Sequence, residues 1–157
     1  MRRVAASLNV QPSALYWHVH GKDELFGLMA AQIYREAGDP NGLDAHWRDW
    51  LRTFARNLRT ALASRRDAAL LCAQAKPHDN GQPRSVVRVA APLPDLGLST
   101  EQALTVKSST IAYTIGWALY ESNPGMQEFL GGLLDIDACF EAGLEALVAG
   151  FALSLQP

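Results

Sequence analysis

Apolar residues recur every three or four positions along most of this chain, and this helical period constrains the fold more than any other feature. The clearest run is Trp47, Leu51, Phe54, Leu58 and Leu62, which share one face of a helix while arginines occupy the other faces. No segment alternates apolar and polar residues in the manner of a half-buried strand. The sequence therefore predicts an all-α protein.

Local signals mark where the helices begin and end. Asp44 is the expected N-cap of the helix described above. Ser99 and Gln102 fit a capping box at the start of a second long helix, and the Asn-Pro-Gly sequence at 123–125 is expected to stop it. The other expected helices cover residues 22–36, 66–75, 99–120 and 137–155, with Pro- and Gly-rich turns at 39–42 and 76–83.

Composition narrows the class of protein. Hydrophobic residues make up 48% of the 157 residues and charged residues 19%, which excludes intrinsic disorder. No apolar run approaches the roughly 18 residues of a membrane span and no charged-then-apolar leader opens the chain, so we expect a cytoplasmic protein with no membrane partner. Cys72 and Cys139 are too few and too far apart for a disulfide framework and are expected to be reduced and buried.

The charge is unevenly divided. The first 22 residues hold Arg2, Arg3 and Lys22 and no acid, for a local charge of +3. The remaining chain has eleven basic residues against sixteen acidic ones, or −5. A basic start on an acidic body suggests that the N-terminal end meets an anion, although a cluster this small is also common on a solvated surface.

The first twenty residues have the spacing of two short helices joined by a tight turn. Val4, Ala5 and Leu8 share a face of the first helix, and Asn9 tolerates the left-handed conformation that a sharp helix end requires. The small side chain of Ala5 lets the two helices cross closely, as in a helix-turn-helix. The residues expected to turn inward after Asn9 are Val10, Leu15 and Val19.

This arrangement places aromatic and polar residues on the outside of the second helix. Tyr16 and His18 are then suited to phosphates or sugars, while Gln11, Ser13 and Ala14 approach base edges. The alternative is an ordinary helical hairpin whose aromatic residues fill the core. The predicted DNA-binding residues are Arg2, Arg3, Gln11, Pro12, Ser13, Ala14, Tyr16, Trp17, His18 and Lys22.

Residues 4–19, followed by Lys22 and Leu25, resemble the DNA-binding segment of the TetR family of bacterial repressors, and the Leu-Tyr-Trp-His-Val run at 15–19 is most similar to its tetracycline-repressor subgroup. The similarity continues at Trp47, Arg66-Asp67, Lys76-Pro77 and 101–104. It implies a ligand-responsive regulator, a repressor, that binds operator DNA as a homodimer. Residues 1–36 would form a partial helix-turn-helix domain with a connecting helix, and residues 37–157 a helical ligand-binding and dimerisation domain.

The resemblance has one departure at the start of the chain. Family members carry a further helix before the helix-turn-helix, and this first helix is missing here. Without it Val4, Leu8 and Leu15 would lose apolar cover, so we expect that the given start is truncated. The alternative is a helical ligand-binding dimer that has no DNA-binding activity.

A second departure concerns the ligand. Polar positions of the family's magnesium–tetracycline site are taken here by Gly38, Phe54, Cys72 and Tyr120, which do not offer the oxygen ligands that Mg²⁺ requires. We therefore expect no metal and no cofactor, and an apolar or aromatic effector instead of magnesium–tetracycline. The predicted ligand-binding residues are Phe54, Leu58, Cys72, Lys76, Trp117 and Tyr120.

The two last long helices, at about 99–120 and 137–155, are rich in small residues and apolar over much of their circumference. Such helices must be covered on every side, so we expect a homodimer through this pair. The alternative is that both helices lie in the core of a monomer. The small residues are Ala103, Ser108, Ser109, Ala112, Gly116, Ala138, Ala142, Gly143, Ala146, Ala149 and Gly150.

Catalysis is not expected. The sequence has no Glu-x-x-His pair, phosphate-binding loop, Gly-x-Ser-x-Gly or Gly-x-Gly-x-x-Gly. His18 and His20 are two positions apart and would point to different sides of a helix. Glu141 and Glu145 share a helix face but have no third ligand, so we expect them to be solvated.

Overall fold

The computed structural model describes residues 1–38, 46–76 and 89–155, and over these ranges every regular element is a helix, which confirms the all-α prediction. The elements are α1 (Arg2–Ser7), α2 (Pro12–Tyr16), α3 (Lys22–Ala37), α4 (Trp47–Ala63), α5 (Ala68–Gln74), α7 (Thr100–Glu121), α8 (Pro124–Gly131) and α9 (Ile136–Ser154). None of the described helices is long and apolar enough to cross a bilayer.

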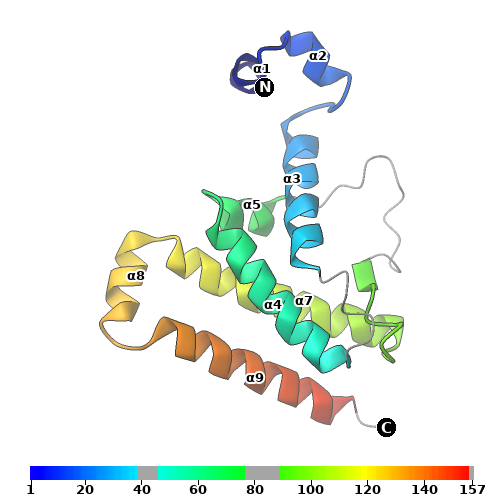
Figure 1. The fold of residues 1–157 in the computed structure, drawn as a ribbon, viewed down its shortest axis with the longest axis vertical. Coiled ribbons are helices and arrows are strands. Elements are labelled where there is room, and N and C mark those ends of the chain that lie inside the picture. The colour runs from blue at the N-terminus through cyan, green and yellow to red at the C-terminus, as the bar shows by residue number, and fades with distance from the viewer. Residues whose placement is uncertain (39–45, 77–88, 156–157) are drawn as a thin grey trace.

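The chain forms a small head on a larger helical body (Figure 1). α1 and α2 pack on each other beyond the N-terminal end of α3. α3 runs from this head into the body, where α4 contacts α3, α5, α7 and α9. α8 is the short connection between the two long helices α7 and α9.

α4 lies at the centre of the core, as its apolar stripe predicts. Leu51, Phe54 and Leu58 are almost completely buried. They meet apolar side chains of neighbouring helices, including Phe140 and Leu144 of α9. Burying a side chain of this size contributes about 1.5–3 kcal/mol, so this stripe fixes the position of the helices around α4.

The capping signals were only partly interpreted correctly. The capping box is confirmed, since the Gln102 N–H donates to Ser99 Oγ at 3.2 Å and Gln102 Oε1 accepts from the Ser99 N–H at 2.8 Å. Asp44 lies outside the described residues, and the N-cap of α4 is His46, whose Nδ1 accepts from the Arg48 N–H at 3.3 Å. The prediction of Asp44 was wrong because an imidazole nitrogen can accept as a carboxylate does.

The Asn-Pro-Gly sequence at 123–125 ends α7 as predicted, but it also starts α8, which the sequence had not suggested. Asn123 Oδ1 accepts from the N–H groups of Gly125 and Met126, both at 3.1 Å. Pro124 occupies the first turn, where its missing N–H is not needed. The turns expected at 39–42 and 77–83 lie outside the described residues.

Glu141 and Glu145 are not merely solvated, so that prediction was wrong. The Arg56 Nη2 donates to Glu141 at 2.7 Å and the Arg52 Nε donates to Glu145 at 2.8 Å. Hydrogen bonds from these arginines lower the pKa of both carboxyls. The pairs hold α9 against α4, and the sequence could not show them because 85 and 93 positions separate their members.

Both cysteines are free thiols. Cys72 is buried as expected, whereas Cys139 is only partly covered. The prediction that both are buried was therefore wrong for Cys139, which lies in the first turn of α9.

Candidate functional site: helix-turn-helix and Lys107 cavity

The turn between α1 and α2 has the geometry predicted from Asn9. Its φ of 55° is left-handed, which few residues other than glycine and asparagine adopt easily. Ala5 is completely buried at the crossing of the two helices, and its carbonyl accepts from the Val10 N–H at 3.0 Å. The sharp turn and the small contact residue together form a helix-turn-helix.

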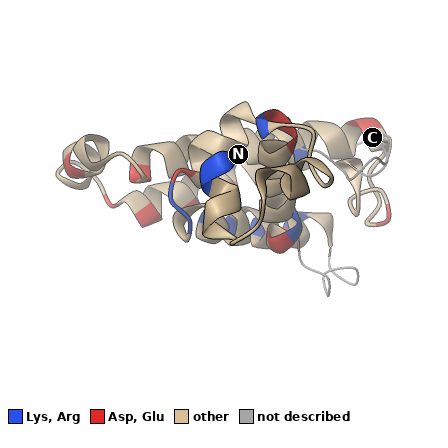
Figure 2. Cartoon of the chain, turned by 90° about the horizontal axis from the view of Figure 1, so that it is seen from above, with Lys and Arg blue, Asp and Glu red and all other residues tan. Residues whose placement is uncertain are grey.

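The predicted DNA-binding residues lie on the surface of this head. All of them are exposed except Pro12 and Ala14, which are half-buried. Trp17 is 85% exposed and Tyr16 50% exposed, so these aromatic rings do not fill a core as the hairpin alternative required. The basic residues of α1 are coloured on the ribbon beside the N-terminus (Figure 2).

The prediction that Val10, Leu15 and Val19 turn inward after Asn9 is only partly confirmed. Val19 is buried and Leu15 half-buried, but Val10 is 42% exposed and Leu8 59% exposed. The prediction for Val10 was wrong because Ala5 already fills the α1–α2 crossing and no described helix covers the face that carries Leu8 and Val10.

The predicted ligand-binding residues are not gathered in one place. Leu58 and Cys72 belong to the buried core. Lys76 lines a hollow between α3 and α5. Trp117 and Tyr120 of α7 contact each other edge-on, with ring centroids 6.4 Å apart, and Tyr120 is 49% exposed.

Phe54 lines an apolar cavity of about 390 Å³, which we call the Lys107 cavity. The cavity lies where α3, α4, α7 and the segment at 89–92 converge, and its volume is at the lower end for small-molecule sites. Trp50 stacks on Phe54 with ring centroids 5.0 Å apart. The lining residues are Ala31, Tyr34, Arg35, Gly38, Trp50, Phe54, Val89, Ala91, Pro92, Lys107 and Ile111.

Lys107 is the residue that the sequence interpretation missed. Its Nζ donates to the Ala91 carbonyl at 2.6 Å and lies 5.5 Å from the Trp50 ring centroid and 5.6 Å from that of Phe54. Burial lowers the pKa of this amine to about 8. A signal was present in the sequence, because Lys107 is the only charged residue between Glu101 and Glu121.

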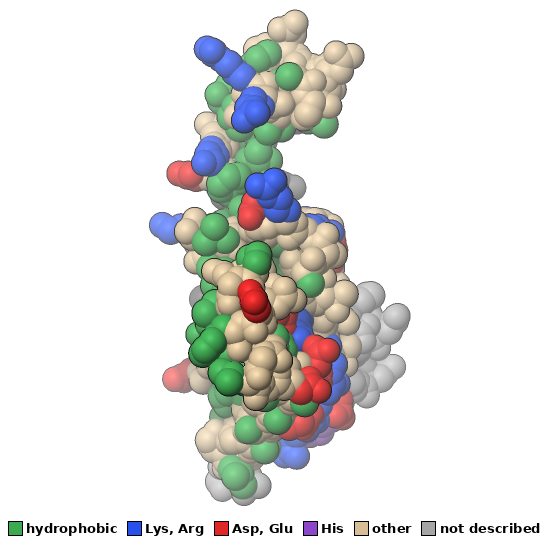
Figure 3. Space-filling model, turned by 90° about the vertical axis from the view of Figure 1, so that its left-hand side faces the viewer, with side chains coloured by type: hydrophobic (Ala, Val, Ile, Leu, Met, Phe, Trp, Pro, Cys, Tyr) green, Lys and Arg blue, Asp and Glu red, His purple; other side chains and the backbone are tan. Residues whose placement is uncertain are grey.

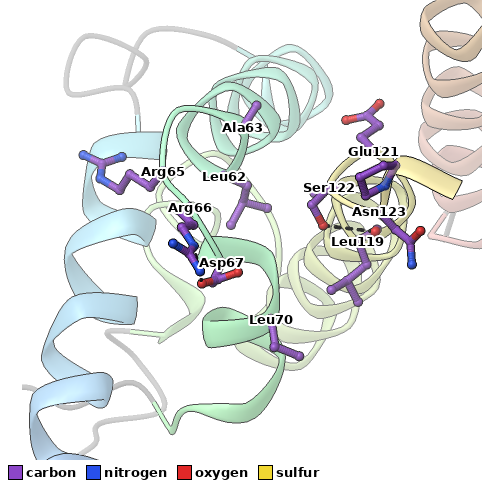
Figure 4. A pocket seen from close by; sticks show the side chains of 12 residues that line it. Leu62, Ala63, Arg65, Arg66, Asp67, Leu70, Leu119, Glu121, Ser122 and Asn123 are labelled. Carbon is purple, nitrogen blue, oxygen red and sulfur yellow. Dashed lines mark hydrogen bonds and ion pairs between the residues drawn. The ribbon is translucent and has the colours of Figure 1, made fainter. Parts of the chain in front are cut away.

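A larger hollow of about 560 Å³ opens between the α4–α5 turn and the end of α7 (Figure 4). Its charges are already matched within the protein. Arg66 pairs with Asp67 at 3.2 Å, Arg65 pairs with Glu36 at 2.5 Å, and Glu121 pairs with Arg59. This hollow therefore offers a ligand no uncompensated charge.

The sequence of this chain matches the family model described as tetracyclin repressor-like, C-terminal domain, over residues 39–132. The chain belongs to the TetR family of transcriptional regulators. The tetracycline repressor protein class A from transposon 1721 of Escherichia coli is 30% identical over 96% of this chain and 80% of its own length.

Two solved TetR-family structures match nearly the whole chain. BioQ bound to its double-stranded DNA operator is 30% identical, covers 97% of this chain and 84% of its own, and gives a TM-score of 0.65. A TetR variant from Acinetobacter baumannii in complex with minocycline is 28% identical, covers 99% and 86%, and gives a TM-score of 0.75. The TetR family consists of ligand-responsive regulators of transcription and not of enzymes.

Proposed function

We propose that this TetR-family chain is a repressor that binds operator DNA as a homodimer in the cytoplasm and is released by a small apolar or aromatic effector, without a resident metal or cofactor. In this proposal residues 1–36 contain the DNA-binding part with its connecting helix. Residues 37–157 bind the effector and form the dimer.

The observation that carries the proposal is the exposure of Tyr16, Trp17 and His18 on a helix-turn-helix. Large aromatic side chains are rarely so exposed unless they meet a partner. In the second helix of such a motif, the partner is the edge and backbone of a DNA major groove. Lys22 is also exposed and follows this helix, where a phosphate would be reached.

The surface of α7, α8 and α9 supports a dimer. Phe129, Leu133 and Leu153 are 60–71% exposed, and hydrophobic side chains gather over the α8 side of the body (Figure 3). Small residues of α7 and α9 are exposed as well, among them Ala112, Ala138, Ala142, Ala146 and Ala149. A second copy covering this surface would place two α2 helices on one face, and successive major grooves require a separation of about 34–36 Å.

In this proposal the effector releases the DNA because effector binding and DNA binding are thermodynamically linked. An effector that binds better to a dimer whose α2 helices no longer match the groove spacing lowers DNA affinity, typically by about 1–3 kcal/mol. The Lys107 cavity is suited to hold that effector because α3 lines it and also carries the head.

The test is fluorescence anisotropy of the 157-residue chain with duplexes from the DNA beside its own gene. We expect binding that an excess of nonspecific DNA does not displace and that weakens steeply as the salt concentration rises. In Lys22→Ala the slope of log affinity against log salt concentration should be smaller in magnitude by about two, because a dimer loses two phosphate contacts. Arg66→Ala, an equal loss of charge on the body, is the matched control and should keep the slope. Absence of binding at low salt would contradict the proposal.

The dimer has a separate test by sedimentation equilibrium. Ala142→Glu places a charge in the exposed small-residue stripe of α9 and should give a monomer. Gln74→Glu, an exposed position on α5, adds the same charge outside the proposed dimer surface and should leave a dimer. A wild-type chain that sediments as a monomer at micromolar concentration would refute this part.

One observation favours a second candidate function. Leu8 and Val10 are exposed on the head, and their uncovered face would weaken a DNA-binding unit. A helical ligand-binding dimer without DNA-binding activity would have this surface. It is distinguished by effector binding together with no salt-dependent DNA binding.

A further inference from the structure

Lys107 is an ammonium group held in apolar surroundings. Its Nζ has one carbonyl partner, Ala91, and the faces of Trp50 and Phe54 nearby. Among the described residues, no carboxylate lies within ion-pair distance of it. The side chain is partly buried. A partly buried cation without a counter-ion is costly to keep, and the cost is reduced when an anion enters its site.

The rest of the cavity lining points to the same kind of ligand. The described lining holds a second cation, Arg35, and no acidic residue. Trp50 is 97% buried, and its indole N–H has no acceptor among the described residues. The hollow in Figure 4 differs because its cations already have carboxylate partners.

We propose that the Lys107 cavity binds an aromatic carboxylic acid, whose carboxylate pairs with the Lys107 ammonium while its ring system lies against Trp50, Phe54 and Ile111. The inference rests on the proposed effector function and names the effector's chemical class. A neutral aromatic ligand would contact the apolar walls of the cavity but would leave the Lys107 ammonium without an anion. A cationic ligand would be repelled by Lys107 and Arg35.

The ionisation state of Lys107 fits this role. Its pKa of about 8 leaves the ammonium as the major form at neutral pH. The other titratable and charged groups that face the cavity are Tyr34 and Arg35 of α3. Burial raises the pKa of Tyr34, so its phenol stays neutral and does not compete for the ammonium. Its hydroxyl donates to the Cys72 carbonyl at 3.5 Å.

The test compares two probes of equal shape, 2-naphthoate and 2-naphthamide, by isothermal titration calorimetry of the full chain at pH 7. We expect the acid to bind about tenfold more tightly than the amide, because a charge-assisted pair replaces a neutral hydrogen bond. In Lys107→Met, which keeps the aliphatic stem against the rings, the ratio should fall to about one. Arg66→Met, an exposed cation outside this cavity, should retain the wild-type ratio.

A measurement on the wild-type chain covers the case in which Lys107→Met fails to fold. The chain has three lysines, Lys22, Lys76 and Lys107, so their ¹³Cε signals can be assigned by NMR. Saturating 2-naphthoate should raise the titration midpoint of the Lys107 signal, and 2-naphthamide should not. An unchanged midpoint, an equal affinity for the two probes, or no binding of either would overturn the proposal.

These outcomes are separate from those of the proposed regulator function. Salt-dependent DNA binding with no preference for the acid would leave the repressor proposal in place and refute the effector class. Binding of the acid at Lys107 without DNA binding would support the effector class and refute the repressor proposal.

Discussion

The phenol of Tyr113 on α7 lies directly over Gly143 on α9, and its hydroxyl donates to the Phe140 carbonyl at 2.7 Å. A Cβ built on Gly143 would lie 3.0 Å from Tyr113 Cζ and closer still to the hydroxyl oxygen. Gly143 therefore sets how closely α7 and α9 approach. The small residues of α9 thus differ in their surroundings, since Gly143 packs against α7 while Ala142 and Ala146 lie on the surface of the chain.

Gly143→Ala should destabilise the protein by about 1–2 kcal/mol, because the cost of overpacking exceeds the gain in helix propensity. The measurement is urea unfolding followed by circular dichroism. Adding Tyr113→Phe removes the nearest atom and should recover part of the loss, which a double-mutant cycle detects. Gly116→Ala, where a Cβ meets nothing within 4 Å, should be neutral or stabilising.

Glu141→Gln should lower the free energy of unfolding at pH 7 by at most about 1 kcal/mol, since the pair with Arg56 is half exposed. The native pKa of Glu141 lies below its ordinary 4.5, so its contribution is complete above pH 4.5 and is lost as the pH falls through the native pKa. The difference between wild type and variant should shrink over that range. Glu128→Gln removes a carboxylate without an ion pair in the described structure and should change the free energy of unfolding at pH 7 by less than about 0.5 kcal/mol.

Because of Lys107, the free energy of unfolding should increase as the pH rises above about 8. Its native pKa of about 8 lies below the ordinary 10.5, so between these values the unfolded chain binds more protons than the native one. The wild type should therefore gain on the order of 1–3 kcal/mol relative to Lys107→Met between pH 8 and 10.5. Urea unfolding at a series of pH values measures this, and a constant difference would contradict it.

Trp17→Ala should separate DNA binding from stability. The side chain is 85% exposed, so the free energy of unfolding should change by less than about 0.5 kcal/mol. Affinity for operator DNA should fall by about tenfold or more, as expected for an aromatic contact residue. Met29→Ala truncates another exposed apolar residue, on α3, and should alter neither quantity.

Magnesium–tetracycline should produce no saturable quenching of tryptophan fluorescence at micromolar concentration. Burial raises the pKa of the Cys72 thiol, which keeps it protonated and a poor metal ligand. Phe54 adds no oxygen ligand. The class A tetracycline repressor serves as the positive control, and saturable quenching in this chain would show that the expected loss of the metal site is wrong.

The sequence was most informative where a signal is local. The stripe on α4 and the capping box at Ser99 depend on residues within a few positions of one another, and both were predicted correctly. The second function of Asn123, as the cap of α8, was missed because a helix stop and a helix start share the same residue types.

The Lys107 cavity could not be assembled from the sequence because its walls come from distant segments. Lys107 and Ala91 meet only when α7 packs beside the 89–92 segment, and Tyr34 arrives from α3. A linear pattern shows Lys107 as one charge in an apolar helix. The ion pair between Arg52 and Glu145 escaped prediction for the same reason.

α3 connects the cavity to the head with a single rigid element. It has 16 residues, or about 24 Å at a rise of 1.5 Å per residue. Its C-terminal half lines the Lys107 cavity through Tyr34 and Arg35, and its other end carries α1 and α2. By this geometry a tilt of about 5° at the cavity displaces α2 by about 2 Å, comparable to the length of a hydrogen bond to a base. In the proposed repressor, the length of this one helix would amplify a small shift at the cavity into a displacement of α2 relative to the major groove.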